Sequence, residues 1–222
     1  MVHDVLQKID HTLLRPDVTV DEVGRFVEEG LDLGVLSICI APSMVAPIVS
    51  RYPEARITAV CGFPSGQHLP AVKAAEAAFL AEQGASEIDM VISLTAAIEH
   101  RFCDIEREVR LIRDEVPGVT LKTIMESAVL DDAALTNACS AAVAGGADYV
   151  KTSTGFHPAG GATLHAVRIM AEAVAGRAKV KASGGIRNLR QAQELLAAGA
   201  DRLGVSRTRD LLAGAELATA GY

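Results

Sequence analysis

The chain has 222 residues, of which 50% are hydrophobic and 22% charged, and a formal net charge of −7. This composition is typical of a globular protein with a sizeable core. The acidic balance and the lack of a long basic run argue against nucleic-acid or membrane-surface partners. No signal-peptide pattern occurs, and no apolar run approaches the ~20 residues of a bilayer span, so the sequence predicts a cytoplasmic protein.

Short apolar, β-branched runs alternate with helical patterns along the chain. The predicted strands span 10–14, 37–41, 57–61, 87–92, 120–126, 149–152, 179–183 and 202–205. Helix-end signals lie between them: a capping box at 19–22, glycine C-caps at Gly84 and Gly199, and an acidic helix start at 131–132.

Eight strand–helix units in 222 residues predict an α/β fold, a single (β/α)8 barrel domain with parallel strands over residues 1–222. The main rival is an open doubly wound sheet. That fold favours a GxGxxG turn after an early strand, and none is present.

Lysine is scarce and unusually placed. Only six of the 21 basic residues are lysines, and four of the six lie inside predicted strands, namely Lys122, Lys151, Lys179 and Lys181. A buried lysine is costly unless it is paired or has a function. Lys179 stands at a strand entrance, where a snorkelling or ion-paired side chain is the better interpretation.

Lys151 and Lys181 lie near the ends of two successive strands, where a barrel carries its active site. Neighbouring strands are ~4.8 Å apart, so inward-facing amines at this height would interact strongly. Two ammonium groups in a partly dry pocket lower the pKa of one of them, which supplies a neutral amine for Schiff-base chemistry. The structural alternative, two lysines that only form ion pairs, is less favoured.

Asp89 is the candidate acid–base partner. In the strand at 87–92, alternation places Asp89 on one face and the apolar Ile88 and Met90 on the other, so Asp89 should point into the barrel. An acidic residue that merely begins a strand describes Glu87 better. Lys122 lies lower on the next strand and is expected to pair with a carboxylate such as Asp89 and to orient it.

Glycine-containing turns after the last three strands predict an anion site. Its candidates are Gly155, Gly184, Gly185, Gly204 and Ser206, with Arg207 adding charge. Backbone N–H groups in such turns bind phosphate, commonly after strands seven and eight of these barrels. The implied ligand is a small phosphorylated carbonyl compound. Histidine and cysteine spacings indicate neither a metal site nor a disulfide.

Seven motifs together resemble the deoxyribose-phosphate aldolase family. They are IDHTLL (9–14), GFPSG (62–66), EIDMV (87–91), LKTIME (121–126), DYVKTSTGF (148–156), VKASGGIR (180–187) and GVS (204–206). The resemblance implies a class I aldolase that reversibly cleaves 2-deoxy-D-ribose 5-phosphate to D-glyceraldehyde 3-phosphate and acetaldehyde, without a metal or cofactor. A homodimer is plausible for such an enzyme.

The resemblance also implies roles for individual residues. Lys151 resembles the Schiff-base lysine, Lys181 its pKa-lowering neighbour, and Asp89 the acid–base group that works through a water. The glycines and Ser206 resemble the phosphate contacts. Tyr222 matches a tail tyrosine that assists proton transfer in some relatives.

Two segments depart from the family pattern. SLTAAI (93–98) replaces a run often written NIGALK, and GVSRT (204–208) replaces a serine-rich turn. Two alternatives therefore stay open: a Schiff-base barrel enzyme for a different phosphorylated sugar, and a non-catalytic barrel that binds a sugar phosphate.

Overall fold

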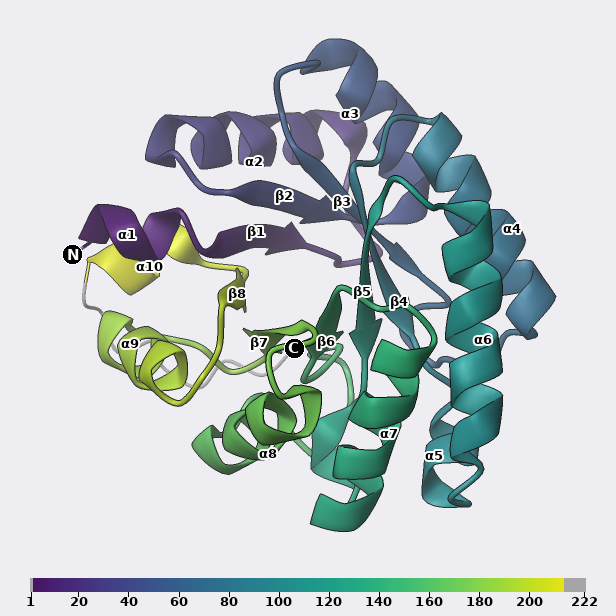
Figure 1. Ribbon diagram of the computed structural model, residues 1–222. Helices are drawn as coiled ribbons and strands as arrows, with labels where there is room; N and C mark the ends of the chain where they lie inside the picture. The colour runs from purple at the N-terminus through teal and green to yellow at the C-terminus, as the bar shows by residue number, and fades with distance from the viewer. Residues whose placement is uncertain (1, 214–222) are drawn as a thin grey trace.

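The computed structural model describes residues 2–213, which form a closed barrel of eight parallel strands surrounded by helices (Figure 1). The strands are β1 (Ile9–Leu13), β2 (Ser37–Ile40), β3 (Ile57–Cys61), β4 (Glu87–Val91), β5 (Thr120–Ile124), β6 (Tyr149–Lys151), β7 (Lys179–Ser183) and β8 (Arg202–Val205). Each pairs with the next, and β8 closes on β1. The predicted (β/α)8 fold is confirmed, and each strand bound lies within two residues of its prediction.

Helices cover the outside of the barrel. They are α1 (Val2–Leu6), α2 (Val20–Leu33), α3 (Val45–Arg51), α4 (Pro70–Glu82), α5 (Leu94–Ile98), α6 (Phe102–Glu115), α7 (Asp132–Ala144), α8 (Leu164–Val174), α9 (Leu189–Ala197) and α10 (Thr208–Leu212), with 3₁₀ turns η1 (Pro42–Met44) and η2 (Ser127–Val129). Within residues 2–213, none of these helices has the length and apolar content needed to cross a membrane.

The predicted helix-end signals are present. Thr19 and Glu22 form a reciprocal capping box at the start of α2, and Asp131 accepts a hydrogen bond from the Ala134 amide at the start of α7. Gly84 and Gly199 follow α4 and α9 with φ of 99° and 115°. This is the left-handed region, where a residue without Cβ ends a helix at least cost. Local signals of this kind fix where each strand begins.

The strands separate two chemically different regions. Ile88 and Met90 on β4 are fully buried in the apolar cluster that joins strands to helices. Glu87 and Asp89 on the same strand are equally buried, but they bond the side chain of Lys122 inside the barrel. Barrel interiors are usually filled with branched apolar residues. Here the interior is an ionic network, so it is the region to examine for chemistry.

The side chain of His11 on β1 contacts both α2 and α10, the last helix that the structure describes. Its ring stacks on Phe26 of α2 at a centroid distance of 3.6 Å, and Nδ1 lies 2.8 Å from Oγ1 of Thr208, the first residue of α10. Burial and then the charge of Arg209 lower the pKa of His11 from 6.5 to about 4. The ring is therefore neutral in the folded protein at neutral pH.

This lowered pKa predicts a loss of stability on acidification. The unfolded chain takes up a proton near pH 6.5 and the folded chain only near pH 4, so the His11 contribution is complete above 6.5 and is lost as pH falls through that window. The loss is about 3 kcal/mol. Urea unfolding of the His11→Gln variant should lack this slope between pH 6.5 and 4, whereas His68→Gln, at an exposed histidine, should keep it. Equal slopes in the two variants would contradict the assignment.

Candidate active site

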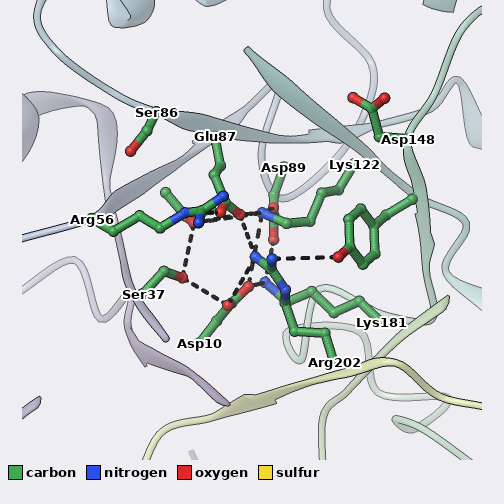
Figure 2. Close-up of polar contacts among 12 residues, drawn as sticks. Asp10, Ser37, Arg56, Ser86, Glu87, Asp89, Lys122, Asp148, Lys181 and Arg202 are labelled. Atoms are coloured by element: carbon green, nitrogen blue, oxygen red, sulfur yellow. Dashed lines mark hydrogen bonds and ion pairs between the residues drawn. The ribbon is translucent and has the colours of Figure 1, made fainter. Parts of the chain in front are cut away.

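One carboxylate, that of Asp89, is surrounded by three lysines in the barrel interior. Its Oδ1 lies 2.8 Å from Nζ of Lys122, and its Oδ2 lies 2.8 Å from Nζ of Lys151 and 2.7 Å from Nζ of Lys181. All four side chains are at most 2% exposed. Figure 2 shows Asp89, Lys122 and Lys181 converging from three strands. The structure thus brings together the four charged residues that the sequence singled out.

Strand register explains this convergence. Lys151 and Lys181 are directly paired across β6 and β7, and Asp89 is directly paired with Lys122 across β4 and β5. In a parallel sheet, paired residues point to the same face at the same height. The two lysines predicted to be neighbours therefore share one level of the barrel.

The position of Asp89 refines the expected interaction between the two lysines. Their amines share its Oδ2, so a carboxylate stands between the two nitrogens. Burial opposes the charge on Lys181, but Asp10 and Asp89 outweigh it and raise the pKa of Lys181. The sequence predicted a lowered pKa for one member of the pair, and the contacts identify Lys181 as the member that remains an ammonium.

A second layer of charged groups lies deeper in the barrel and was missed by sequence reasoning. Asp10 on β1 accepts hydrogen bonds from Lys181 and, at 2.7 Å, from the Ser37 hydroxyl. Arg202 on β8 bonds Glu87 and lies 3.3 Å from Asp10 (Figure 2). The alternation argument used for Asp89 also applies to Asp10, Glu87 and Arg202, because each of them lies on a strand at an inward-facing position.

Glu87 requires a correction. The sequence favoured an acidic residue at a strand start with no further role, yet Glu87 is fully buried. It forms ion pairs with Lys122 and Arg202, and its Oε1 lies 2.5 Å from Nε of Arg56. The first residue of a barrel strand can face the closed interior, so the strand entrance is not necessarily exposed to solvent.

The interior network joins three carboxylates to four buried basic side chains, and Arg56 adds a further cation at Glu87. Its carboxylates are Asp10, Glu87 and Asp89, and its basic side chains are Lys122, Lys151, Lys181 and Arg202. Burial raises the pKa of Asp89, but Lys122, Lys151 and Lys181 together hold it well below the ordinary value. The pKa of Asp10 is lowered for the same reason, against the effect of its burial. These carboxylates are therefore ionised in the folded protein.

Three candidate phosphate-binding glycines lie at the ends of β6 and β7. Gly155, Gly184 and Gly185 have φ of 85°, 87° and 78°. A Cβ added at Gly184 would lie 3.6 Å from Cα of Gly155, so the two turns are adjacent, and a Cβ at Gly155 or Gly185 would meet open space. Turns of this shape present backbone N–H groups to an anion.

The remaining phosphate candidates lie on β8 and in the loop that follows it. Gly204 lies within β8, in agreement with the predicted strand at 202–205, and a Cβ there would lie 2.8 Å from Cβ of Ser183, so close strand packing already requires glycine. Ser206 and Arg207 are exposed between β8 and α10. Tyr222 lies outside residues 2–213. Within that described range, no group of three or more His, Cys, Asp or Glu side chains is arranged to hold a metal ion.

The chain is similar to known aldolases in sequence and in fold. The model of the "DeoC/LacD family aldolase" matches residues 4–214. "Deoxyribose-phosphate aldolase" from Nocardia farcinica is 50% identical over 212 residues, 95% of this chain and 94% of that protein. The protein of the same name from Corynebacterium diphtheriae is 47% identical over 211 residues, 95% of this chain and 96% of that one.

Solved structures show the same likeness. "QR15, an Aldolase" has a TM-score of 0.90 and 36% identity, with 94% of each chain covered. The structure described as "Unique tetrameric structure of deoxyribose phosphate aldolase from Aeropyrum pernix" has a TM-score of 0.86 and 32% identity over 95% of this chain and 90% of that one. The fold, the lysine-lined interior and these matches agree: the chain belongs to the DeoC/LacD aldolase family.

Proposed function

We propose that the protein is a deoxyribose-phosphate aldolase, which reversibly cleaves 2-deoxy-D-ribose 5-phosphate to D-glyceraldehyde 3-phosphate and acetaldehyde. The observation that carries the proposal is the shared Oδ2 of Asp89, 2.8 Å from Lys151 and 2.7 Å from Lys181. A nucleophilic amine, a fixed ammonium and a carboxylate at one point are the groups that Schiff-base aldol chemistry needs. The matching curated relatives support the choice of substrate.

Lys151 is the proposed nucleophile. Lys181 and Lys122 each pair with two or more carboxylates, whereas Lys151 pairs with Asp89 alone among residues 2–213. Lys151 is thus the interior lysine held by the fewest carboxylates, and its Nζ is the one proposed to attack the substrate carbonyl.

The proposed reaction begins when Nζ of Lys151 adds to the aldehyde carbon of the open-chain sugar. Loss of water gives a cationic imine. The C3 hydroxyl then gives its proton to Asp89 through a water, the C2–C3 bond breaks, and its electron pair moves into the imine to form an enamine. Glyceraldehyde 3-phosphate departs, C2 of the enamine takes a proton, and water hydrolyses the new imine to acetaldehyde. The lysine imine is the electron sink, so this route uses neither a metal nor an organic cofactor.

Lys181 and Lys122 support this chemistry from either side of Asp89. The Lys181 ammonium donates a hydrogen bond to the carboxylate oxygen that Lys151 also contacts, and it is the proposed proton donor during the reaction. Lys122 holds the other oxygen at 2.8 Å and fixes the orientation of the carboxylate. Charged groups that are already held in position stabilise the transition state without having to reorient during the reaction.

The phosphate group of the substrate is proposed to bind at the adjacent turns of Gly155, Gly184 and Gly185, with Ser206 and Arg207 contributing from the next loop. The chain carries a net charge of −7 and repels anions overall, so a local site of backbone N–H groups and cations is required. Anchoring the phosphate away from the reacting carbons orients them for attack by Lys151.

Reductive trapping tests this function. Acetaldehyde and borohydride should leave an ethyl group on Lys151, located by peptide mass mapping, while the exposed Lys8 and Lys179 serve as internal controls. The protein should also release acetaldehyde from deoxyribose 5-phosphate. An adduct on another interior lysine, or labelling of Lys151 no greater than that of Lys8 and Lys179, would remove Lys151 from the mechanism. Preference for hydroxylated donor aldehydes or ketones over acetaldehyde would favour an aldolase for a different sugar.

A further inference from the structure

A buried ion pair lies outside the barrel, separate from the interior network. Lys73 on α4 and Glu108 on α6 are 0% and 2% exposed, and Nζ of Lys73 lies 2.7 Å from Oε1 of Glu108. In Figure 1 these helices lie side by side next to β4. Two buried charges at this position take no part in the proposed chemistry.

Each member of the pair also bonds the backbone where β4 leaves the barrel. Nζ of Lys73 donates to the carbonyl of Val91 at 2.7 Å, and Oε2 of Glu108 accepts from the amide of Ser93 at 2.9 Å. Val91 is the last residue of β4, two residues beyond Asp89, and Ser93 caps α5. The pair therefore holds both sides of the exit from the strand that carries Asp89.

The loop after β3 packs against Lys73 and against the backbone at the end of β4. A Cβ at Gly62 would lie 2.9 Å from Cε of Lys73, and the Gly62 amide donates to Glu76 of α4 at 2.8 Å. At the other end of the loop, a Cβ at Gly66 would lie 2.2 Å from the carbonyl oxygen of Ile92. Loop 62–66 and the end of β4 thus pack as one unit on Lys73.

Stability alone does not account for this arrangement. Burying two charges costs desolvation energy, and well-packed apolar side chains of similar volume are often equally stable or more so. A fully hydrogen-bonded buried network instead gives the chain one defined position. In this protein the network fixes the position of the backbone from Val91 to Ser93, just after Asp89.

We infer that Lys73 and Glu108 are positioning residues that set the carboxyl end of β4, so that the Asp89 carboxylate meets the amines of Lys151 and Lys181. This inference rests on the proposed function. The pair touches no reacting atom, and its effect reaches the site through the backbone from Val91 to Asp89. Misplacing a catalytic group by about 1 Å can cost ~10²-fold in rate.

The test compares the double variant Lys73→Met/Glu108→Leu with the wild type. The apolar pair should keep the fold, because side chains of similar volume fill the site, with a melting temperature lowered by the loss of two hydrogen bonds to the backbone. It leaves the Val91 carbonyl and the Ser93 amide without their side-chain partners. We expect kcat for deoxyribose 5-phosphate cleavage to fall ~10- to 100-fold, with KM changed by less than ~3-fold, because the proposed phosphate turns lie on β6 and β7. The control Glu106→Gln/Arg110→Gln removes an exposed ion pair of α6 and should leave both constants unchanged.

A substrate-free measurement separates this inference from the proposed function. The carboxyl ¹³C signal of Asp89 should shift in the double variant and stay in place in the control, whatever substrate the wild type accepts. A folded double variant with an unchanged signal and kcat would overturn the inference, as would a rise in KM alone. Failure of the double variant to fold would assign the pair to stability and equally overturn it. A wild type inactive on deoxyribose 5-phosphate would remove only the proposed function.

Discussion

Replacing Lys151 by leucine is expected to lower the rate of deoxyribose 5-phosphate cleavage by ~10⁴-fold or more, the scale seen when a covalent nucleophile is removed. No other described lysine can replace it, because Lys122 and Lys181 are each held by at least two carboxylates. Steady-state release of acetaldehyde measures the loss, and trapping with acetaldehyde and borohydride should leave no adduct.

The same variant tests whether Lys151 is needed for the fold. Asp89 keeps its ion pairs with Lys122 and Lys181 when Lys151 is replaced, so the fold should be retained with little change in the free energy of unfolding. The matched control is Lys179→Leu on β7, since Lys179 is exposed and lies over the ring of Tyr149 at 5.8 Å. That control should keep its activity. Appreciable turnover by Lys151→Leu would disprove the nucleophile assignment.

Replacing Lys181 by leucine is expected to lower kcat ~10²- to 10³-fold, the range for loss of a proton-transfer group, and to move the acidic limb of the pH–rate profile to higher pH. The direction of this shift in the pH–rate profile follows from the charges around Lys151. Removing a fixed ammonium beside Lys151 removes repulsion and leaves Asp10 and Asp89 less compensated, so both changes favour a proton on Lys151. A higher pH is then needed to generate the free amine.

The Lys181→Arg variant separates charge from proton transfer. Arginine keeps a permanent cation beside Asp89 but cannot release a proton at ordinary pH, so its acidic limb should stay near the wild-type position while kcat falls. Lys181→Leu should also be less stable by about 3–5 kcal/mol, because it leaves the buried Asp10 carboxylate without its shortest ion pair. Full activity of Lys181→Leu at neutral pH would contradict the proposed role.

Much of the fold could be predicted from local patterns. Alternation of apolar and polar residues marked the eight strands, and capping residues such as Thr19 and Asp131 marked the helices between them. These signals are local because a side chain's face depends only on its place in the strand, and a cap bonds amides two or three residues away. The same alternation placed Asp89, Lys151 and Lys181 inside the barrel before their contacts were known.

Only the tertiary structure showed which of these side chains meet. Asp10 and Lys181 are 171 residues apart in the chain, and their contact depends on the closure of β8 against β1. Lys73 and Glu108 lie on two helices, where a charged residue in a helical pattern normally indicates an exposed face. Sequence alone determined the barrel, the strand faces and the inward direction of the strand lysines, because these follow from periods of two and 3.6 residues. The carboxylate shared by three lysines and the buried pair behind β4 depend on strand register and helix packing, which bring together residues that no local period relates.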